Sequence, residues 1–179
     1  MSYFDLQVNG YAGIDFNAER LSAGEMRVAC EAMKEDGTEG ALATIITGSM
    51  ESMKGKLRNL VRAREEDEVV REVIVGIHIE GPFLNKADGY IGAHPREQAL
   101  PATVDGMKEL LEAAEGLTKI VTLAPERDQG SKTTAYLAGQ GIVVSAGHCD
   151  PSLEELRAAI DAGLRMFTHL GNGCPSQLT

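Results

Sequence analysis

Residues 73–79 read Val73-Ile74-Val75-Gly76-Ile77-His78-Ile79, a nearly unbroken apolar run that ends at Glu80. Strands of a parallel sheet have this pattern when helices cover both faces, because neither side of the strand meets water. On both sides of this run, further apolar runs alternate with segments in which apolar residues recur at the helical period. Such alternation predicts a parallel α/β sheet with right-handed crossovers.

The neighbouring elements can be placed from their caps and turns. Ser22 and Ser152 are each followed three positions later by a glutamate, which is the capping-box spacing that opens a helix. The charged run 62–68 is predicted to be the solvated end of a helix. The spacing fits a doubly wound sheet and a (β/α)8 barrel equally well. The predicted strands are 3–8, 41–46, 73–79, 119–123, 141–146 and 165–169, and the predicted helices are 22–37, 53–68, 104–116, 131–139 and 152–163.

Composition narrows the class of protein. The 179 residues carry a net charge of −10 without a cluster of Lys and Arg, so neither nucleic acid nor a membrane surface is an expected partner. Cys30, Cys149 and Cys174 are widely spaced and form no CxxC pair, which favours a reducing compartment over a disulfide scaffold. With no long apolar run and no signal-peptide pattern, we expect a single cytoplasmic domain over residues 1–179.

Three residues of metal-binding types stand at the ends of predicted strands. Glu80 follows the third strand, His148 lies just past the fifth, and His169 closes the sixth. The carboxyl ends of the strands form the face on which α/β proteins place their sites. One carboxylate and two imidazoles form a common zinc-ligand set that leaves a position open for water. The alternative is that each residue is merely a polar group at a strand end.

Other polar residues allow two interpretations each. His78 alternates with Glu80 on one strand, so it is either a group that orients a metal ligand or a satisfied core histidine. His94 lies in the irregular stretch 80–101, which is long enough to suggest a functional loop, and either binds substrate or is solvated. The turn Gly171-Asn172-Gly173 either presents N–H groups to an anion or is an ordinary turn.

Six short motifs follow one another along the chain. They are Asp5-Leu6-Gln7-Val8-Asn9-Gly10, His78-Ile79-Glu80-Gly81-Pro82-Phe83-Leu84-Asn85, Gly92-Ala93-His94, Thr122-Leu123-Ala124-Pro125-Glu126, Ser145-Ala146-Gly147-His148 and Thr168-His169-Leu170. Together these motifs are far more specific than any one of them, and the series resembles the N-acetylglucosamine-6-phosphate deacetylase family of the amidohydrolase superfamily. The resemblance runs over essentially the whole sequence.

The resemblance implies an α/β fold, a (β/α)8 TIM-type barrel beside a small β-sandwich, of which this chain holds about six of the eight βα units. It implies hydrolysis of the acetamide of N-acetylglucosamine 6-phosphate with a divalent metal ion, expected to be Zn. Gln7 and Asn9 stand where many amidohydrolases carry two histidines, which suggests one main metal. By motif matching the metal ligands are Glu80, His148 and His169, and the substrate-binding residues are Ala93, His94, Asn172 and Gly173.

Two departures from the family pattern bear on function. Thr-His-Leu is usually followed by Phe-Asn-Ala-Met, whereas this chain has Gly171-Asn172-Gly173-Cys174. The family's acid/base aspartate is expected beyond Thr179, so no residue here takes the catalytic role. A non-catalytic metal or sugar-phosphate binding module, or a piece that another chain completes, therefore stay open as alternatives. Because a sheet of six strands leaves two free edges, at 3–8 and 165–169, we expect a homo-oligomer.

Overall fold

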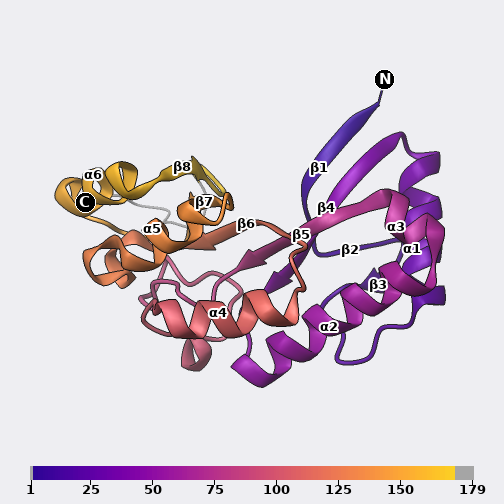
Figure 1. Cartoon of the computed structure of the whole chain (residues 1–179), viewed down its shortest axis with the longest axis horizontal. Helices are drawn as coiled ribbons and strands as arrows, with labels where there is room; N and C mark the ends of the chain where they lie inside the picture. The colour runs from indigo at the N-terminus through magenta and orange to yellow at the C-terminus, as the bar shows by residue number, and fades with distance from the viewer. Residues whose placement is uncertain (1, 172–179) are drawn as a thin grey trace. The chain divides into compact units, whose positions relative to one another are not determined.

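The computed structural model describes residues 2–171, and Figure 1 traces them in chain order. Two short strands, one six-residue helix and the three 3-10 turns (η) were not predicted from the sequence. The elements are β1 Tyr3–Val8, β2 Gly10–Tyr11, β3 Ile14–Asp15, α1 Ala23–Glu35, β4 Thr38–Ile46, α2 Met50–Glu66, α3 Glu68–Val73, β5 Ile74–Glu80, η1 Arg96–Gln98, α4 Val104–Ala113, β6 Thr118–Leu123, η2 Pro125–Arg127, η3 Gln129–Ser131, α5 Lys132–Gly139, β7 Val143–Ala146, α6 Leu153–Ala162 and β8 Leu164–Phe167.

The main sheet has six strands in the order β1-β4-β5-β6-β7-β8. The pairs β1–β4, β6–β7 and β7–β8 are parallel. The order follows the chain without reversing, whereas a doubly wound sheet reverses direction at a switch point. This order distinguishes between the two folds that the sequence left open, and it is that of an incomplete TIM-type barrel. Beyond this sheet, the only other paired strands in residues 2–171 are the hairpin β2–β3.

The chain divides into two compact units. The first comprises residues 1–46, 50–79 and 109–119, and the second comprises 47–49, 80–108 and 120–179. Within the first unit, α1 begins with the predicted capping box, in which the Ser22 side chain accepts from Glu25 N–H and the Glu25 side chain accepts from Ser22 N–H. One face of α1 is buried, and α1 packs on α2 and α3. The buried residues of α1 are Met26, Ala29, Cys30 and Met33.

The short helix α3 was missed because most of it lies in residues 69–72, to which the prediction gave no element between the helix 53–68 and the strand 73–79. Asp67 separates the two helices. Its side chain accepts hydrogen bonds from the N–H groups of Val69 and Val70 and so caps the start of α3. Ion pairs from Arg27 to Asp67 and from Lys34 to Glu72 then join α1 to the segment that holds α3. The predicted helix 53–68 ends at Glu66 instead, α3 takes up residues 68–73, and the predicted strand 73–79 begins at Ile74 as β5.

The second unit holds the carboxyl ends of β5 to β8 and the long loop 81–103. Only the turn η1 interrupts this loop, as the irregular pattern predicted. Backbone hydrogen bonds fix it at several points, among them Asn85 N–H to the His148 carbonyl and Ala124 N–H to the Phe83 carbonyl. Helix α6 begins with the second predicted capping box, at Ser152 and Glu155. Within residues 2–171 no helix is long and apolar enough to cross a membrane.

Candidate metal centre

Three of the predicted site residues stand at or just past the carboxyl ends of β5, β7 and β8, in the second unit. Glu80 is the last residue of β5, and His148 lies two residues past the end of β7. His169 was expected to close the sixth strand, but β8 ends at Phe167 and His169 lies in the turn that follows. The difference has a backbone cause: His169 has φ of 57°, which no strand residue adopts.

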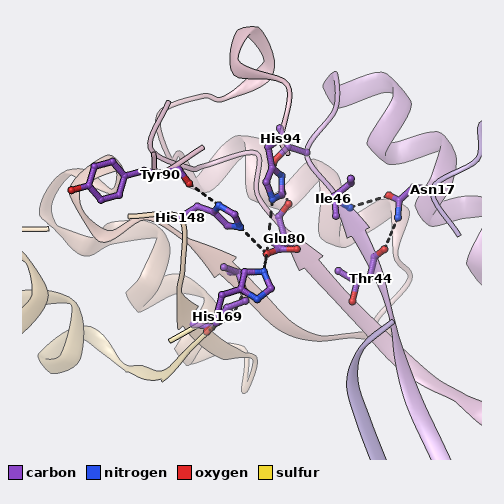
Figure 2. Close-up of polar contacts among 12 residues, drawn as sticks. Asn17, Thr44, Ile46, Glu80, Tyr90, His94, His148 and His169 are labelled. Atoms are coloured by element: carbon purple, nitrogen blue, oxygen red, sulfur yellow. Dashed lines mark hydrogen bonds and ion pairs between the residues drawn. The ribbon is translucent and has the colours of Figure 1, made fainter. Parts of the chain in front are cut away.

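The side chains of these residues converge on one carboxylate oxygen. Figure 2 shows Glu80 at the centre, with three imidazoles directed at it. Oε1 of Glu80 lies 2.9 Å from Nε2 of His169, 3.2 Å from Nε2 of His148 and 3.9 Å from Nε2 of His94. Ligand atoms of Glu80, His148 and His169 all lie within 4.8 Å of one another, which is the spacing that could hold one metal ion.

The loop 81–103 fixes the ring of His148. Nδ1 of His148 donates a hydrogen bond of 2.7 Å to the backbone carbonyl of Tyr90, so Nε2 is the ring atom that faces Glu80. Gly92 approaches the same ring so closely that a Cβ there would lie 3.1 Å from Cε1 of His148. A carbonyl that orients a histidine through its second nitrogen is a common partner of a metal-binding imidazole.

Both histidines that follow β7 and β8 have left-handed backbones. His148 has φ of 50° and His169 has φ of 57°. A non-glycine residue in this region costs about 1–3 kcal/mol and persists only where the surrounding structure holds it. The strain places both imidazoles on the carboxyl-terminal side of the sheet, beside Glu80.

The charges in the cluster are strongly coupled. Burial raises the pKa of Glu80, but the neighbouring histidines outweigh burial and hold that pKa below its usual range. Burial lowers the pKa of His148, but the carboxylate of Glu80 and the Tyr90 carbonyl outweigh burial and raise it above its usual value. For His94 burial dominates, and together with the neighbouring His148 it lowers the pKa to about 4. His94 is therefore a neutral ring at pH 7.

A divalent cation would satisfy the polar atoms of this cluster better than they satisfy one another. Nε2 of His148 is buried and, although it is 3.2 Å from Glu80, it makes no hydrogen bond of acceptable geometry. Nδ1 of His94 is also buried without a partner. In a neutral His148 whose Nδ1 carries the hydrogen, the lone pair on Nε2 faces a carboxylate oxygen, and a cation between the two atoms would relieve that repulsion. One carboxylate and two imidazoles also suit zinc by ligand type.

The remaining predicted residues fall in different places. His78 is fully buried and its Nδ1 contacts the Leu6 carbonyl at 3.2 Å, which favours the interpretation as a satisfied core histidine. Ala93 is exposed beside His94, which is buried. Gln7 is half-buried and Asn9 exposed, both in the first unit. Asn172 and Gly173 lie outside the described residues.

Sequence reasoning missed a group of hydrogen bonds among Asn85, Glu126 and Asp150 that lies beside His148 and is called the polar clamp here. Oε1 of Glu126 accepts from the Asn85 side chain at 2.8 Å and from Asp150 N–H at 2.6 Å. Asn85 N–H in turn donates to the His148 carbonyl at 3.0 Å. The clamp joins the loops after β5, β6 and β7 around His148. Asn85 and Glu126 both belong to the six motifs, which was the available signal, but nothing in their spacing revealed that they meet.

The strand order and the Glu-His-His cluster at the carboxyl-terminal strand ends define the class as an incomplete TIM-type barrel with a candidate metal centre. No family model matches the sequence. The chain is 35% identical over 170 residues to N-acetylglucosamine-6-phosphate deacetylase of Bacillus subtilis. The match covers 94% of this chain and 42% of that protein. It is 34% identical over 175 residues to N-acetylgalactosamine-6-phosphate deacetylase of Shewanella, in a match that covers 96% of this chain and 41% of that protein.

Solved structures of N-acetyl-D-glucosamine-6-phosphate deacetylases are also similar to this chain. The crystal structure of N-acetyl-D-glucosamine-6-phosphate deacetylase from Mycobacterium smegmatis matches 96% of this chain and 43% of its own, with a TM-score of 0.85 and 31% identity. A variant of that enzyme, which matches equally well, was solved in complex with N-acetyl-D-glucosamine-6-phosphate. Over nearly its whole length this chain is thus similar to N-acetylglucosamine-6-phosphate deacetylases, and it spans about two fifths of the length of the relatives that it matches.

Proposed function

We propose that this chain carries the metal-binding half of the active site of an enzyme that hydrolyses the acetamide of an N-acetylhexosamine 6-phosphate. The observation that carries the proposal is the convergence of Glu80, His148 and His169 within 4.8 Å, with Nε2 of His148 buried and without a hydrogen bond. Similarity to the deacetylases suggests the substrate class, and the complex of the M. smegmatis relative with N-acetyl-D-glucosamine-6-phosphate supports it.

Glu80, His148 and His169 would hold one divalent cation, for which zinc is proposed from the donor set. When bound, such a cation polarises a carbonyl and lowers the pKa of a water molecule. Tyr90 keeps His148 in the tautomer whose Nε2 is available, because its carbonyl accepts from Nδ1. The strained backbones at His148 and His169 direct both rings to Glu80 before any ligand arrives.

His94 has a separate role in the proposal. It is 8% exposed, its Nδ1 lacks a partner, and its Nε2 lies 3.9 Å from Glu80. Because burial lowers the pKa of His94 to about 4, the ring stays neutral at pH 7 and can donate a hydrogen bond to a sugar oxygen or accept one from a sugar hydroxyl. Ala93, Asn172 and Gly173 complete the proposed substrate-binding set.

The metal half of the proposal is tested on the 179-residue chain. Protein purified without chelator is analysed for bound metal, and Zn²⁺ binding is followed by calorimetry. We expect about one ion per chain in the wild type and a strong loss in His148→Ala and His169→Ala. A metal content that is the same in all three proteins contradicts the proposal.

The substrate half needs ligand binding rather than turnover, because no residue of this chain is assigned as the general acid or base. Glucosamine 6-phosphate is titrated into zinc-loaded wild type and into zinc-loaded His94→Ala. We expect weaker binding in the variant, and weaker binding of unphosphorylated glucosamine to the wild type. Similarity to the Shewanella relative makes galactosamine 6-phosphate the second ligand to compare. Equal affinities of the two proteins for glucosamine 6-phosphate would remove His94 from the site.

We further propose a homo-oligomer, in which the terminal strand β8 is covered. A groove of about 760 Å³ beside β8 is lined mainly by Leu156, Ile160, Leu164, Met166 and Phe167. Phe167 is 42% exposed and Ile160 is 47% exposed, which is unfavourable in water. Sedimentation at micromolar concentration should give a dimer or larger species for the wild type and a shift toward monomer for Phe167→Lys. A wild-type monomer contradicts this part.

A further inference from the structure

A chain of three hydroxyl groups lies at the ends of β6, β7 and β8. Oγ1 of Thr168 is 2.7 Å from Oγ of Ser145 and 2.8 Å from Oγ1 of Thr122. Ser145 and Thr122 are fully buried and Thr168 is 4% exposed. Thr168 is the central member, and it directly precedes His169 in the chain. The three hydroxyls therefore connect three neighbouring strand ends at the residue before a proposed metal ligand.

The backbone around Thr168 is held as tightly as its side chain. Thr168 N–H donates to the Ala146 carbonyl at 2.7 Å. Gly147 permits the close approach, because a Cβ there would lie 2.6 Å from Cγ2 of Thr122 and 3.1 Å from Cβ of Thr168. Immediately after this anchored residue the chain turns into the left-handed region, with φ of 57° at His169. A turn of that kind persists only where its surroundings hold it.

Packing alone does not explain the hydroxyl chain. The hydroxyls of Thr38, Thr118 and Thr133 are also buried, and each lacks a hydrogen-bond partner in the described part of the chain. This fold therefore accepts threonine as a core residue without using its hydroxyl. The hydroxyl of Thr168 instead lies 2.7 Å from that of Ser145 and 2.8 Å from that of Thr122, which restricts the rotamers of all three side chains.

We propose that Ser145, Thr168 and Thr122 are positioning residues that hold the His169 imidazole against Glu80 and so set the geometry and affinity of the metal centre. The metal part of this inference rests on the proposed function. The positioning part does not, because the contact of 2.9 Å between His169 Nε2 and Glu80 Oε1 exists without a metal ion.

The experiment compares four variants of the full chain. Thr168→Val keeps the shape and removes the central hydroxyl, Thr168→Ser keeps the hydroxyl, and Ser145→Ala removes one arm. Thr133→Val is the matched control, because Thr133 is fully buried in the same unit and its hydroxyl has no partner. Co²⁺ binding is followed by visible absorption, since the intensity and position of the bands report the geometry of the ligands.

We expect Thr168→Val to weaken Co²⁺ binding by about 10- to 100-fold, which is typical for partners that orient a metal ligand, and to change the absorption spectrum. Ser145→Ala should fall between wild type and Thr168→Val. Thr168→Ser and Thr133→Val should keep the wild-type affinity and spectrum. If Thr168→Val fails to fold, Ser145→Ala carries the test. Wild-type affinity and spectrum in Thr168→Val, or in Ser145→Ala where it stands alone, overturn the proposal.

A second measurement separates this proposal from the proposed function. In metal-free protein, long-range ¹H–¹⁵N spectra of the imidazoles report the hydrogen bond between His169 and Glu80. Thr168→Val should lose that signal and Thr168→Ser should keep it, whether or not the wild type binds Co²⁺. A wild type that binds no Co²⁺ but shows this pattern contradicts the metal site and supports the positioning role. An unchanged His169 signal in Thr168→Val overturns the positioning role.

Discussion

The two compact units each contain a polar cluster beside a strand end, half-buried in the first unit and largely buried in the second, and the clusters differ in how many of their polar atoms are hydrogen-bonded. In the first unit, Asn17 donates from Nδ2 to the Thr44 carbonyl at 2.9 Å, and its Oδ1 accepts from Ile46 N–H at 3.0 Å. In the second unit, Glu80 faces three imidazoles, and two of their nitrogens are buried without a hydrogen bond. Figure 2 draws the contacts of both clusters.

The difference separates a structural role from a binding role. Asn17 uses both ends of its amide on backbone groups, so it stabilises the fold and has little capacity left for a ligand. The cluster of Glu80 leaves polar atoms unsatisfied at a cost in stability, and it includes two strained backbones, at His148 and His169. Unsatisfied polar groups and strained backbones are expected at functional sites, so this difference favours the proposed metal site over a purely structural role for the Glu80 cluster.

The largest expected effect comes from removing the shared carboxylate. Glu80→Gln keeps the size of the side chain but loses its charge, so zinc binding should weaken by more than about a hundredfold, beyond the range seen for partners outside the ligand shell. Calorimetry with Zn²⁺ measures it. Asn17→Asp adds a carboxylate to the other cluster and should bring no zinc binding. Tight binding by Glu80→Gln would mean that the two clusters do not differ as stated.

The second effect is a pH dependence that belongs to His94. Burial lowers its pKa in the folded chain to about 4 from an ordinary value of 6.5. Between these pH values the unfolded chain binds the proton and the folded chain does not, so stability rises with pH and is lost on acidification. The loss reaches at most about 3 kcal/mol near pH 4. His148 acts in the opposite sense, because its raised pKa adds stability that is present below pH 6.5 and disappears as pH rises above that value.

His94→Gln isolates this contribution, because glutamine does not titrate. Urea unfolding in the presence of EDTA, repeated from pH 4 to pH 7, should give a steeper fall on acidification for wild type than for the variant. Asn59, which does not titrate and is half-buried in helix α2, serves as control, and Asn59→Ala should keep the wild-type slope. Identical slopes for wild type and His94→Gln would show that His94 is solvated in solution.

Sequence alone predicted the fold well and the site in part. The apolar runs and the capping boxes at Ser22 and Ser152 located every strand of the main sheet and five of its helices, because burial and caps leave local patterns. The order of the strands needed the structure, since alternation is the same in barrels and doubly wound sheets. The residue types at strand ends pointed to Glu80, His148 and His169. The Tyr90 carbonyl was beyond reach, because any residue supplies a carbonyl.

The third effect is a loss of stability in the satisfied cluster. Asn17→Ala leaves the Thr44 carbonyl and Ile46 N–H without their partner, which should lower the free energy of unfolding by about 1–3 kcal/mol. Urea unfolding measures it. Asn59→Ala, which removes an exposed contact of 3.2 Å to the Glu19 carbonyl, should change stability by less than about 0.5 kcal/mol. Zinc binding should be unchanged in both, and a loss of zinc binding in Asn17→Ala would join the two clusters functionally.

The smallest effect is a gain of stability at Gly55, in the interior of α2 in the first unit. A Cβ at Gly55 would meet nothing within 4 Å, so Gly55→Ala should stabilise the chain by about 0.5–1 kcal/mol through its helix propensity. Gly141, in the second unit, also has open space around its Cβ position but has φ of 74°, so Gly141→Ala should destabilise instead. Thermal unfolding of the two variants should give a higher melting temperature than wild type for Gly55→Ala and a lower one for Gly141→Ala. Since neither glycine touches the Glu80 cluster, zinc affinity should stay at the wild-type value in both. A destabilised Gly55→Ala would show that α2 carries a constraint beyond its own helix.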